Sequence, residues 1–169
     1  MALTRINNQA LTNVTSAGLP SGTVLQVKSV SHNTEYDITS TTGEDIGLSI
    51  TITPTSATSE FLLTGSIGVN GSNGAFIGLK LFRDSTEIGG GSGNTYNGYK
   101  IWYPNSVSSL DNRTLTSLAI NFLDDPDTAS SITYKVQAFA NANTGGINKR
   151  NSSSDTNVTS QFTIMEIAG

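Results

Sequence analysis

The sequence predicts an all-β protein built as a jelly-roll β-sandwich. Apolar residues recur at every second position in most segments after residue 22, and Gly, Asn, Ser and Asp gather between these segments. No stretch of helical length places apolar residues at positions i, i+3, i+4 and i+7. About eight strands joined by polar turns are typical of a sandwich or jelly roll, so we expect almost no helix.

The first region, residues 1–22, lacks the alternating pattern. Its apolar residues follow neither a helical nor a strand period, and it ends in the Gly- and Pro-containing residues 18–22. We therefore expect an extended N-terminal arm, followed by one sandwich domain over residues 23–169. The apolar side chains of the arm are the candidates for anchoring it on a partner: Leu3, Ile6, Leu11 and Val14.

The alternating runs after the arm are the predicted strands. They cover residues 25–27, 48–52, 60–69, 75–82, 118–122 and 132–140. Between two of these runs, residues 70–74 consist of Asn, Gly and Ser. Because Asn and Gly tolerate positive φ, this segment predicts a hairpin turn.

The last apolar run differs from the others because both of its faces are apolar. Phe162 and Ile164 lie on one face, and Met165 and Ile167 lie on the other. With one face in the sandwich core, the other face needs a cover that a single small sandwich cannot supply, and a symmetric oligomer would supply it. Phe139, Met165 and Ile167 are therefore the candidate contacts of a homotrimer.

The composition excludes several classes of function. Charged residues make up only 13% of the 169 residues, and the formal net charge is -4, so no basic field marks a nucleic-acid partner. There is no cysteine, which excludes disulfides and thiolate metal sites. The start of the chain lacks the apolar stretch of a signal peptide, and no window approaches the roughly 20 apolar residues of a membrane span. We expect a protein made in the cytoplasm that does not insert into a membrane.

Several segments, taken in order, carry a resemblance to a known group of proteins. They are residues 2–11 (ALTRINNQAL), 22–27 (GTVLQV), 47–57 (GLSITITPTSA), 81–89 (LFRDSTEIG), 123–128 (LDDPDT), 132–137 (ITYKVQ) and 162–168 (FTIMEIA). Together they span nearly the whole chain. In these segments the chain resembles tail-fibre-like or decoration-like proteins of marine phages, including cyanophages.

The resemblance implies a fold, a setting and a partner, but no catalytic residue set. The implied fold is a trimeric jelly roll similar to the tumour-necrosis-factor and complement C1q heads, and the implied setting is the virion. The chain would then be a fibre or spike tip whose arm attaches it to other virion proteins. A capsid decoration or cement protein is the alternative placement.

One segment concentrates aromatic side chains beside the glycine-rich residues 89–93. Residues 96–103 contain the only tryptophan and three of the five tyrosines. Flat aromatic faces with polar tips suit stacking on sugars, and they also suit a core or a subunit contact. The candidates for contact with a host glycan, in a lectin-like module, are Tyr96, Tyr99, Trp102 and Tyr103.

The residues of catalysis and metal binding are sparse, so we expect neither an enzyme nor a cofactor. His32 is the only histidine, and no G-x-S-x-G elbow accompanies it. Paired carboxylates occur at residues 44–45 and 124–127, which keeps a polysaccharide depolymerase open as an alternative. A weaker candidate is a calcium site formed by Asp124, Asp125 and Asp127, whose alternative is a polar turn bent by Pro126.

Overall fold

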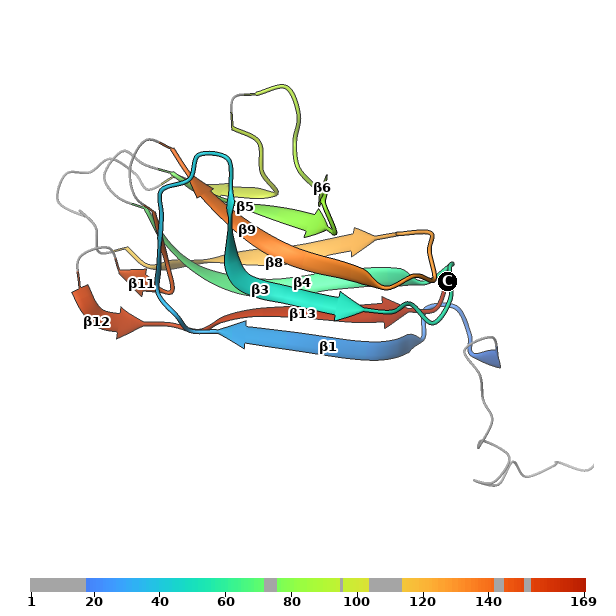
Figure 1. Cartoon of the computed structure of the whole chain (residues 1–169). Coiled ribbons are helices and arrows are strands. Elements are labelled where there is room, and N and C mark those ends of the chain that lie inside the picture. Colours follow the sequence, from blue (N-terminus) through green and yellow to red (C-terminus); the bar gives the residue numbers. More distant parts are fainter. Residues whose placement is uncertain (1–17, 72–75, 95, 104–113, 142–144, 151–152) are drawn as a thin grey trace, which may run out of the picture.

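The computed structural model is a sandwich of two antiparallel sheets that lie face to face (Figure 1). The structure describes residues 18–71, 76–94, 96–103, 114–141, 145–150 and 153–169. The candidate anchoring residues of the arm, Leu3, Ile6, Leu11 and Val14, lie outside the described residues. Within the described part there is no α-helix, and so none long and apolar enough to cross a membrane.

The larger sheet has six strands, and we call it the six-stranded sheet. In spatial order its strands are β1 (Val24–His32), β13 (Ser160–Ile167), β4 (Glu60–Gly71), β10 (Gly145–Ile147) and β2 (Tyr36–Ile38), and β8 (Thr116–Asp124) pairs with the other edge of β4. All of these pairings are antiparallel.

The smaller, five-stranded sheet covers the first. Its order is β3 (Glu44–Ile52), β9 (Ile132–Ala140), β5 (Ile77–Arg83) and β6 (Thr86–Ile88), and β7 (Lys100–Trp102) also pairs with β5. A separate pair joins β11 (Lys149–Arg150) to β12 (Ser153–Asn157).

The order of the long strands makes the sandwich a jelly roll. Along the chain they alternate between the sheets: β3, β5 and β9 belong to the five-stranded sheet, and β4, β8 and β13 belong to the six-stranded sheet. This interleaving forces each connection to cross from one layer to the other. The predicted fold class, an all-β jelly-roll sandwich, is confirmed.

The predicted hairpin at residues 70–74 is wrong. β4 lies in the six-stranded sheet between β13 and β8, whereas β5 lies in the other sheet beside β9. Both edges of β4 are already occupied by these partners, so β5 cannot pair with it. Turn residues such as Asn and Gly suit a connection between layers as well as a hairpin, because both need tight changes of direction.

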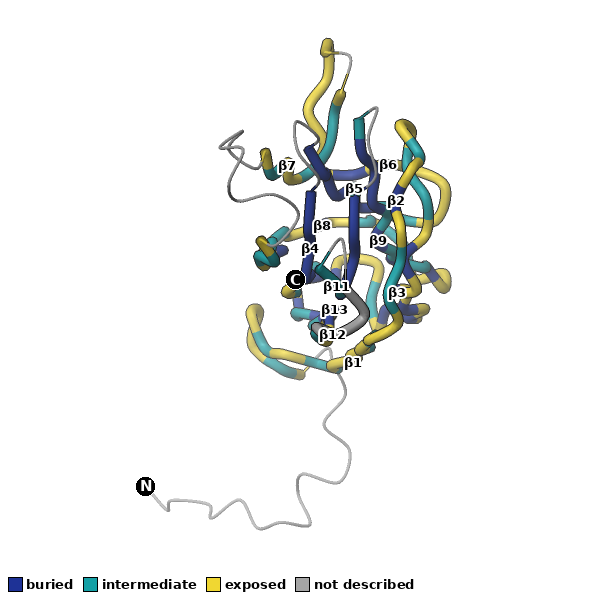
Figure 2. Tube along the Cα trace, turned by 90° about the vertical axis from the view of Figure 1, so that its left-hand side faces the viewer, coloured by how far each residue is buried: buried dark blue, intermediate teal, exposed yellow. Residues whose placement is uncertain are grey.

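The core forms where the alternating apolar positions of the two sheets meet (Figure 2). On β5, Ile77, Leu79 and Leu81 are fully buried, and on β13, Phe162 and Ile164 are too. Full burial of each such side chain contributes about 1.5–3 kcal/mol to folding. The period of two therefore placed the core residues of β5 and β13 correctly, whereas in the predicted run 25–27 the apolar Val27 lies on the outer side and is 55% exposed.

One carboxylate, Glu166, also lies on the inner side of β13 and is fully buried. It accepts hydrogen bonds from the Gln26 side-chain amide at 2.5 Å and from the Thr55 backbone N–H at 2.5 Å. Burial acts to raise the pKa of Glu166, but the nearby Ser59 hydroxyl and the hydrogen bonds from Gln26 and Thr55 outweigh it, and the net pKa lies below the ordinary value. Glu166 thus stays charged and ties the residues after β3 to β1 and β13.

Candidate functional site

The sandwich has two outward faces, and the candidate residues divide between them. The aromatic segment lies at the edge of the five-stranded sheet, where β7 pairs with β5 so that Gly78 faces Ile101 and Ile77 faces Trp102. Trp102 packs partly buried against the core. Because side chains alternate along a strand, Ile101 points to the outer side and is 45% exposed.

Tyr99 also has a structural role. Its hydroxyl donates a hydrogen bond to the Asn121 carbonyl at 2.6 Å and accepts one from the Asn121 N–H at 3.0 Å. Its ring packs edge-on against Phe122 with centroids 5.9 Å apart. Asn121 and Phe122 belong to β8, so Tyr99 links the two sheets along this edge of the sandwich.

Tyr96 and Tyr103 lie on the outer side, around Phe76. The ring centroid of Tyr96 lies 4.7 Å from that of Phe76 and the centroid of Tyr103 lies 6.2 Å from it. Tyr96 is 37% exposed and Tyr103 is 60% exposed. The four candidate glycan contacts are thus split: these two are exposed, whereas Tyr99 and Trp102 are only partly so.

Phe139 lies beneath them on the outer side of β9. A Cβ placed on Gly78 or on Gly98 would lie 2.3 Å or 2.7 Å from the Phe139 ring, so two glycines make room for it. The ring is 1% exposed within a single chain. The sequence predicts Phe139 as a contact of a partner subunit, but its own chain already covers the ring, which therefore offers almost no surface to a partner.

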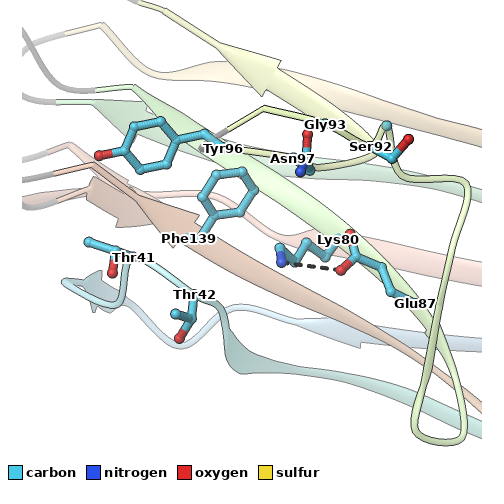
Figure 3. A pocket seen from close by; sticks show the side chains of 10 residues that line it. Thr41, Thr42, Lys80, Glu87, Ser92, Gly93, Tyr96, Asn97 and Phe139 are labelled. Atoms are coloured by element: carbon cyan, nitrogen blue, oxygen red, sulfur yellow. Dashed lines mark hydrogen bonds and ion pairs between the residues drawn. The ribbon is translucent and has the colours of Figure 1, made fainter.

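A hollow of about 310 Å³ opens beside these aromatic rings, and we call it the aromatic hollow (Figure 3). Its lining residues are Thr41, Thr42, Lys80, Glu87, Gly91, Ser92, Gly93, Tyr96, Asn97 and Phe139. They come from the turn between β2 and β3, from β5, from β6 and the loop that follows it, and from β9. Sequence reasoning found Tyr96 but missed the other walls, because only the fold brings these segments together.

Both main walls of the aromatic hollow are braced by side chains. In the turn before β3, the Ser40 hydroxyl accepts hydrogen bonds from the N–H groups of Thr42 at 3.3 Å and Gly43 at 3.0 Å. In the facing loop, the Asn97 side-chain amide donates to the Asn94 carbonyl at 2.8 Å. These local bonds fix the backbone that carries Thr42 and Asn97.

Opposite charges are paired across the outer face of the five-stranded sheet. Lys80 Nζ lies 3.2 Å from Glu87 Oε2 at the aromatic hollow, and 5.5 Å from the Phe139 ring centroid. Lys135 Nζ lies 3.2 Å from Asp45 Oδ1 on the neighbouring strands. This face therefore carries charge in neutral pairs.

The outer face of the six-stranded sheet is of a different kind. Four apolar side chains stand in register across β1, β13, β4 and β8, and we call them the apolar row: Val27, Met165, Leu62 and Leu123. Val27 is 55% exposed and Leu123 is 51% exposed, whereas the central pair is half-buried. Met165 thus lies on the outer side, as its position in the predicted strand indicated, and Ile167 follows it on the same side.

On one side of the apolar row, the next two rows on this face are polar but uncharged, whereas on its other side Ile167 pairs with the charged Glu60. The first contains Ser29, Thr163, Thr64 and Asn121, and the second contains Ser31, Gln161, Ser66 and Ala119. Within the first row, the hydroxyls of Ser29 and Thr163 are 2.9 Å apart and hydrogen-bonded. Across these three rows, no side chain carries a charge.

The candidate calcium ligands do not converge. Asp124 points inward, where Arg83 Nη1 donates to its Oδ2 at 2.9 Å and the Tyr134 hydroxyl donates to the same oxygen at 2.6 Å. Burial and the bond to Asp124 raise the pKa of Tyr134 well above its ordinary value, so Tyr134 keeps its proton for this bond. In the described ranges, no group of three His, Cys, Asp or Glu side chains is arranged to hold a metal ion.

The only histidine, His32, also packs against residues of its own chain. The His32 ring stacks on Tyr36 with centroids 5.4 Å apart, and a Cβ at Gly47 would lie 2.8 Å from it. Asp37, five residues along, pairs with Lys149 at 2.5 Å. The Asp37 carboxylate is thus engaged with a lysine.

Comparisons with known proteins give a distant structural likeness. No protein-family model and no curated protein matches the sequence. Among solved structures, the chain is similar to one described as the structure of infectious bursal disease virus Gx strain, with 12% identity and a TM-score of 0.40. The match covers 86% of this chain, which spans about a third, 34%, of the length of that chain.

Proposed function

We propose that this chain is a non-enzymatic structural protein of a bacteriophage particle, whose sandwich heads assemble into a homotrimer through the outer face of the six-stranded sheet. The observation that carries the proposal is the apolar row, together with the two successive rows without charge on one side of it. The phage setting rests on the sequence resemblance described above.

The apolar row has the chemistry of a surface that excludes water. Charged residues are depleted at the centre of protein interfaces, because their desolvation is costly. Burying the exposed halves of Val27 and Leu123 would gain about 1 kcal/mol each. The hydroxyl and amide groups of these two polar rows can form hydrogen bonds across an interface or remain hydrated at its rim.

The charge of the chain favours this face over the opposite one for self-association. Identical copies with a formal net charge of -4 repel one another, and the repulsion is smallest where the contact itself is uncharged. Meeting through the five-stranded sheet would instead bring Asp45, Glu87 and their lysine partners to the contact.

A matched pair of substitutions tests the proposal. Leu123 and Ile101 are both large apolar residues on outward sides of strands, 51% and 45% exposed, but they lie on opposite faces of the sandwich. Sedimentation equilibrium of the wild type should give the mass of three chains, Leu123→Asp should reduce it, and Ile101→Asp should not. A monomeric wild type, or equal effects of both substitutions, would reject the proposed interface.

The position of the trimer on the particle has two versions, a fibre or spike tip and a capsid decoration protein. In both, the residues before 23 anchor the head to other virion proteins. Particles assembled with labelled protein should carry label at the tail for the first version and over the shell for the second. Removing residues 1–22 should leave the trimer intact and abolish incorporation, and loss of the trimer would contradict the anchoring role.

The absence of catalysis has its own test. The trimer should leave host polysaccharide at its original length after prolonged incubation, as measured by size-exclusion chromatography. Shortened product would instead make the chain a depolymerase.

A further inference from the structure

The aromatic hollow lies on the face opposite to the proposed trimer contact, so an assembled trimer leaves it open. Its volume of about 310 Å³ is at the lower end of the range of about 300–1,000 Å³ for small-molecule sites. That space suits one or two rings of a small ligand, or the exposed end of a longer chain of such rings.

The lining combines an aromatic wall with hydroxyl and amide groups. The Tyr96 ring is 37% exposed and forms one wall, beside the edge of Phe139 (Figure 3). Thr41, Thr42 and Asn97 add groups that both donate and accept hydrogen bonds. A sugar ring requires this pairing, because it has an apolar face of C–H groups and a rim of hydroxyls.

The charge of the aromatic hollow indicates a neutral ligand. Its cation, Lys80, is held 3.2 Å from the carboxylate of Glu87, and the two charges cancel. A phosphate or sialic-type carboxylate would find no unpaired cation in the lining, and the Glu87 carboxylate would repel it. For a neutral sugar the same pair offers a strong donor beside a strong acceptor.

The walls of the aromatic hollow are also braced by contacts within the chain. Hydrogen bonds to Ser40 and from Asn97 fix the two walls, and Phe139 is held between Gly78 and Gly98. Preorganised walls reduce the entropy that binding must overcome.

From these observations we infer that the aromatic hollow binds a neutral hexose or N-acetylhexosamine unit of a glycan, with Tyr96 as the stacking surface and Thr42, Asn97 and the Lys80–Glu87 pair as hydrogen-bonding groups. Of the aromatic residues suggested by the sequence, Tyr96 is retained, and Tyr99, Trp102 and Tyr103 are replaced by polar residues from other strands. The inference is independent of self-assembly, since each chain contains a complete hollow.

The test uses the full chain on an array of neutral and acidic glycans, followed by titration with the best neutral glycan. Tyr96→Ala should weaken binding by about tenfold or more. Tyr103→Ala, which removes a more exposed ring outside the lining, should leave binding unchanged. No binding by the wild type, a preference for acidic glycans, or equal losses in both variants would overturn the inference.

A second pair of variants protects the test against misfolding, because Tyr96 also packs on Phe76. Thr42→Val conserves side-chain volume and removes one lining hydroxyl with its 3.3 Å contact to the Ser40 hydroxyl, and Thr51→Val likewise removes a hydrogen-bonded hydroxyl on the outer side of β3, away from the hollow. Thr42→Val should weaken binding several-fold while Thr51→Val does not, and equal affinities for the two would overturn the inference. The sedimentation mass of each variant separates failure of glycan binding from failure of the trimer.

Discussion

The two outward faces of the sandwich have the same backbone geometry but different side chains. On the six-stranded sheet, three consecutive rows across four strands contain no charge, and one row is wholly apolar. On the five-stranded sheet, Lys80 pairs with Glu87 and Lys135 pairs with Asp45. Paired charges suit a face that remains in water, whereas a face without charge can be dehydrated at little cost.

The contrast is clearest at equivalent edge positions. Ser29 on β1 and Ser49 on β3 are exposed residues near the middle of edge strands, one on each outer face. The cross-strand partner of Ser29 is Thr163, and that of Ser49 is Lys135. The same small residue thus has an uncharged neighbour on one face and an ion-paired lysine on the other, so the difference extends to the edges of the sheets.

Met165→Asp is the substitution with the largest expected effect on the proposed contact. Met165 lies in the apolar row between Val27 and Leu62, so the new carboxylate would be buried without a partner at the centre of the proposed contact. Such a group costs several kcal/mol, and we expect sedimentation to detect monomers at micromolar concentration. Met165→Leu, which conserves volume and polarity, should keep the trimer. A Met165→Asp chain with the wild-type mass would show that the apolar row is not the contact.

The next residue, Glu166, lies on the opposite, inner side of the same strand, so its substitution should change the stability of the fold. Glu166→Gln replaces a carboxylate that accepts several hydrogen bonds, so we expect a loss of about 1.5–3 kcal/mol in the free energy of unfolding at neutral pH. Glu60→Gln, in the half-exposed first position of β4, should change it by less than about 0.5 kcal/mol. Urea denaturation at one fixed protein concentration measures both.

The pH dependence follows from the lowered pKa of Glu166. A carboxylate whose pKa is lower in the folded chain than its ordinary value of 4.5 stabilises the fold fully above that value. The stabilisation is lost as the pH falls through the folded pKa, where the group takes up a proton. The stability gap between wild type and Glu166→Gln should therefore be constant near neutral pH and close below pH 4.5. A gap that widens on acidification would contradict this account.

The sequence allowed the sides of each long strand to be predicted, because side chains alternate with a period of two regardless of the partner strand. Met165 and Ile167 were assigned to the outer side in this way. The rows were not predictable, since they depend on the register between β1, β13, β4 and β8, which are distant in the chain. Strands of two or three residues, such as β2 and β10, are too short for any period to be visible.

The lining of the aromatic hollow was likewise only partly predictable from the sequence. Tyr96 was found because aromatic residues gather in one segment, but Thr42 and Lys80 become neighbours of Tyr96 only through the fold. A further signal comes from the pairing of β5 with β9, in which Gly78 stands opposite Phe139. A glycine facing an aromatic residue is typical of a ring lying flat on a sheet. Reading that signal requires knowing which strands pair.

The smallest expected effect comes from the charged face. Lys135→Met removes the partner of Asp45, whose side chain is 61% exposed, so the pair is largely screened by water. We expect the free energy of unfolding to change by no more than about 0.5 kcal/mol, with the sedimentation mass unchanged. A shift in mass would mean that the five-stranded sheet also contacts a second copy. An unchanged mass, set beside the dissociation expected for Met165→Asp, would assign self-association to one face and leave the other, with its hollow, open to ligands.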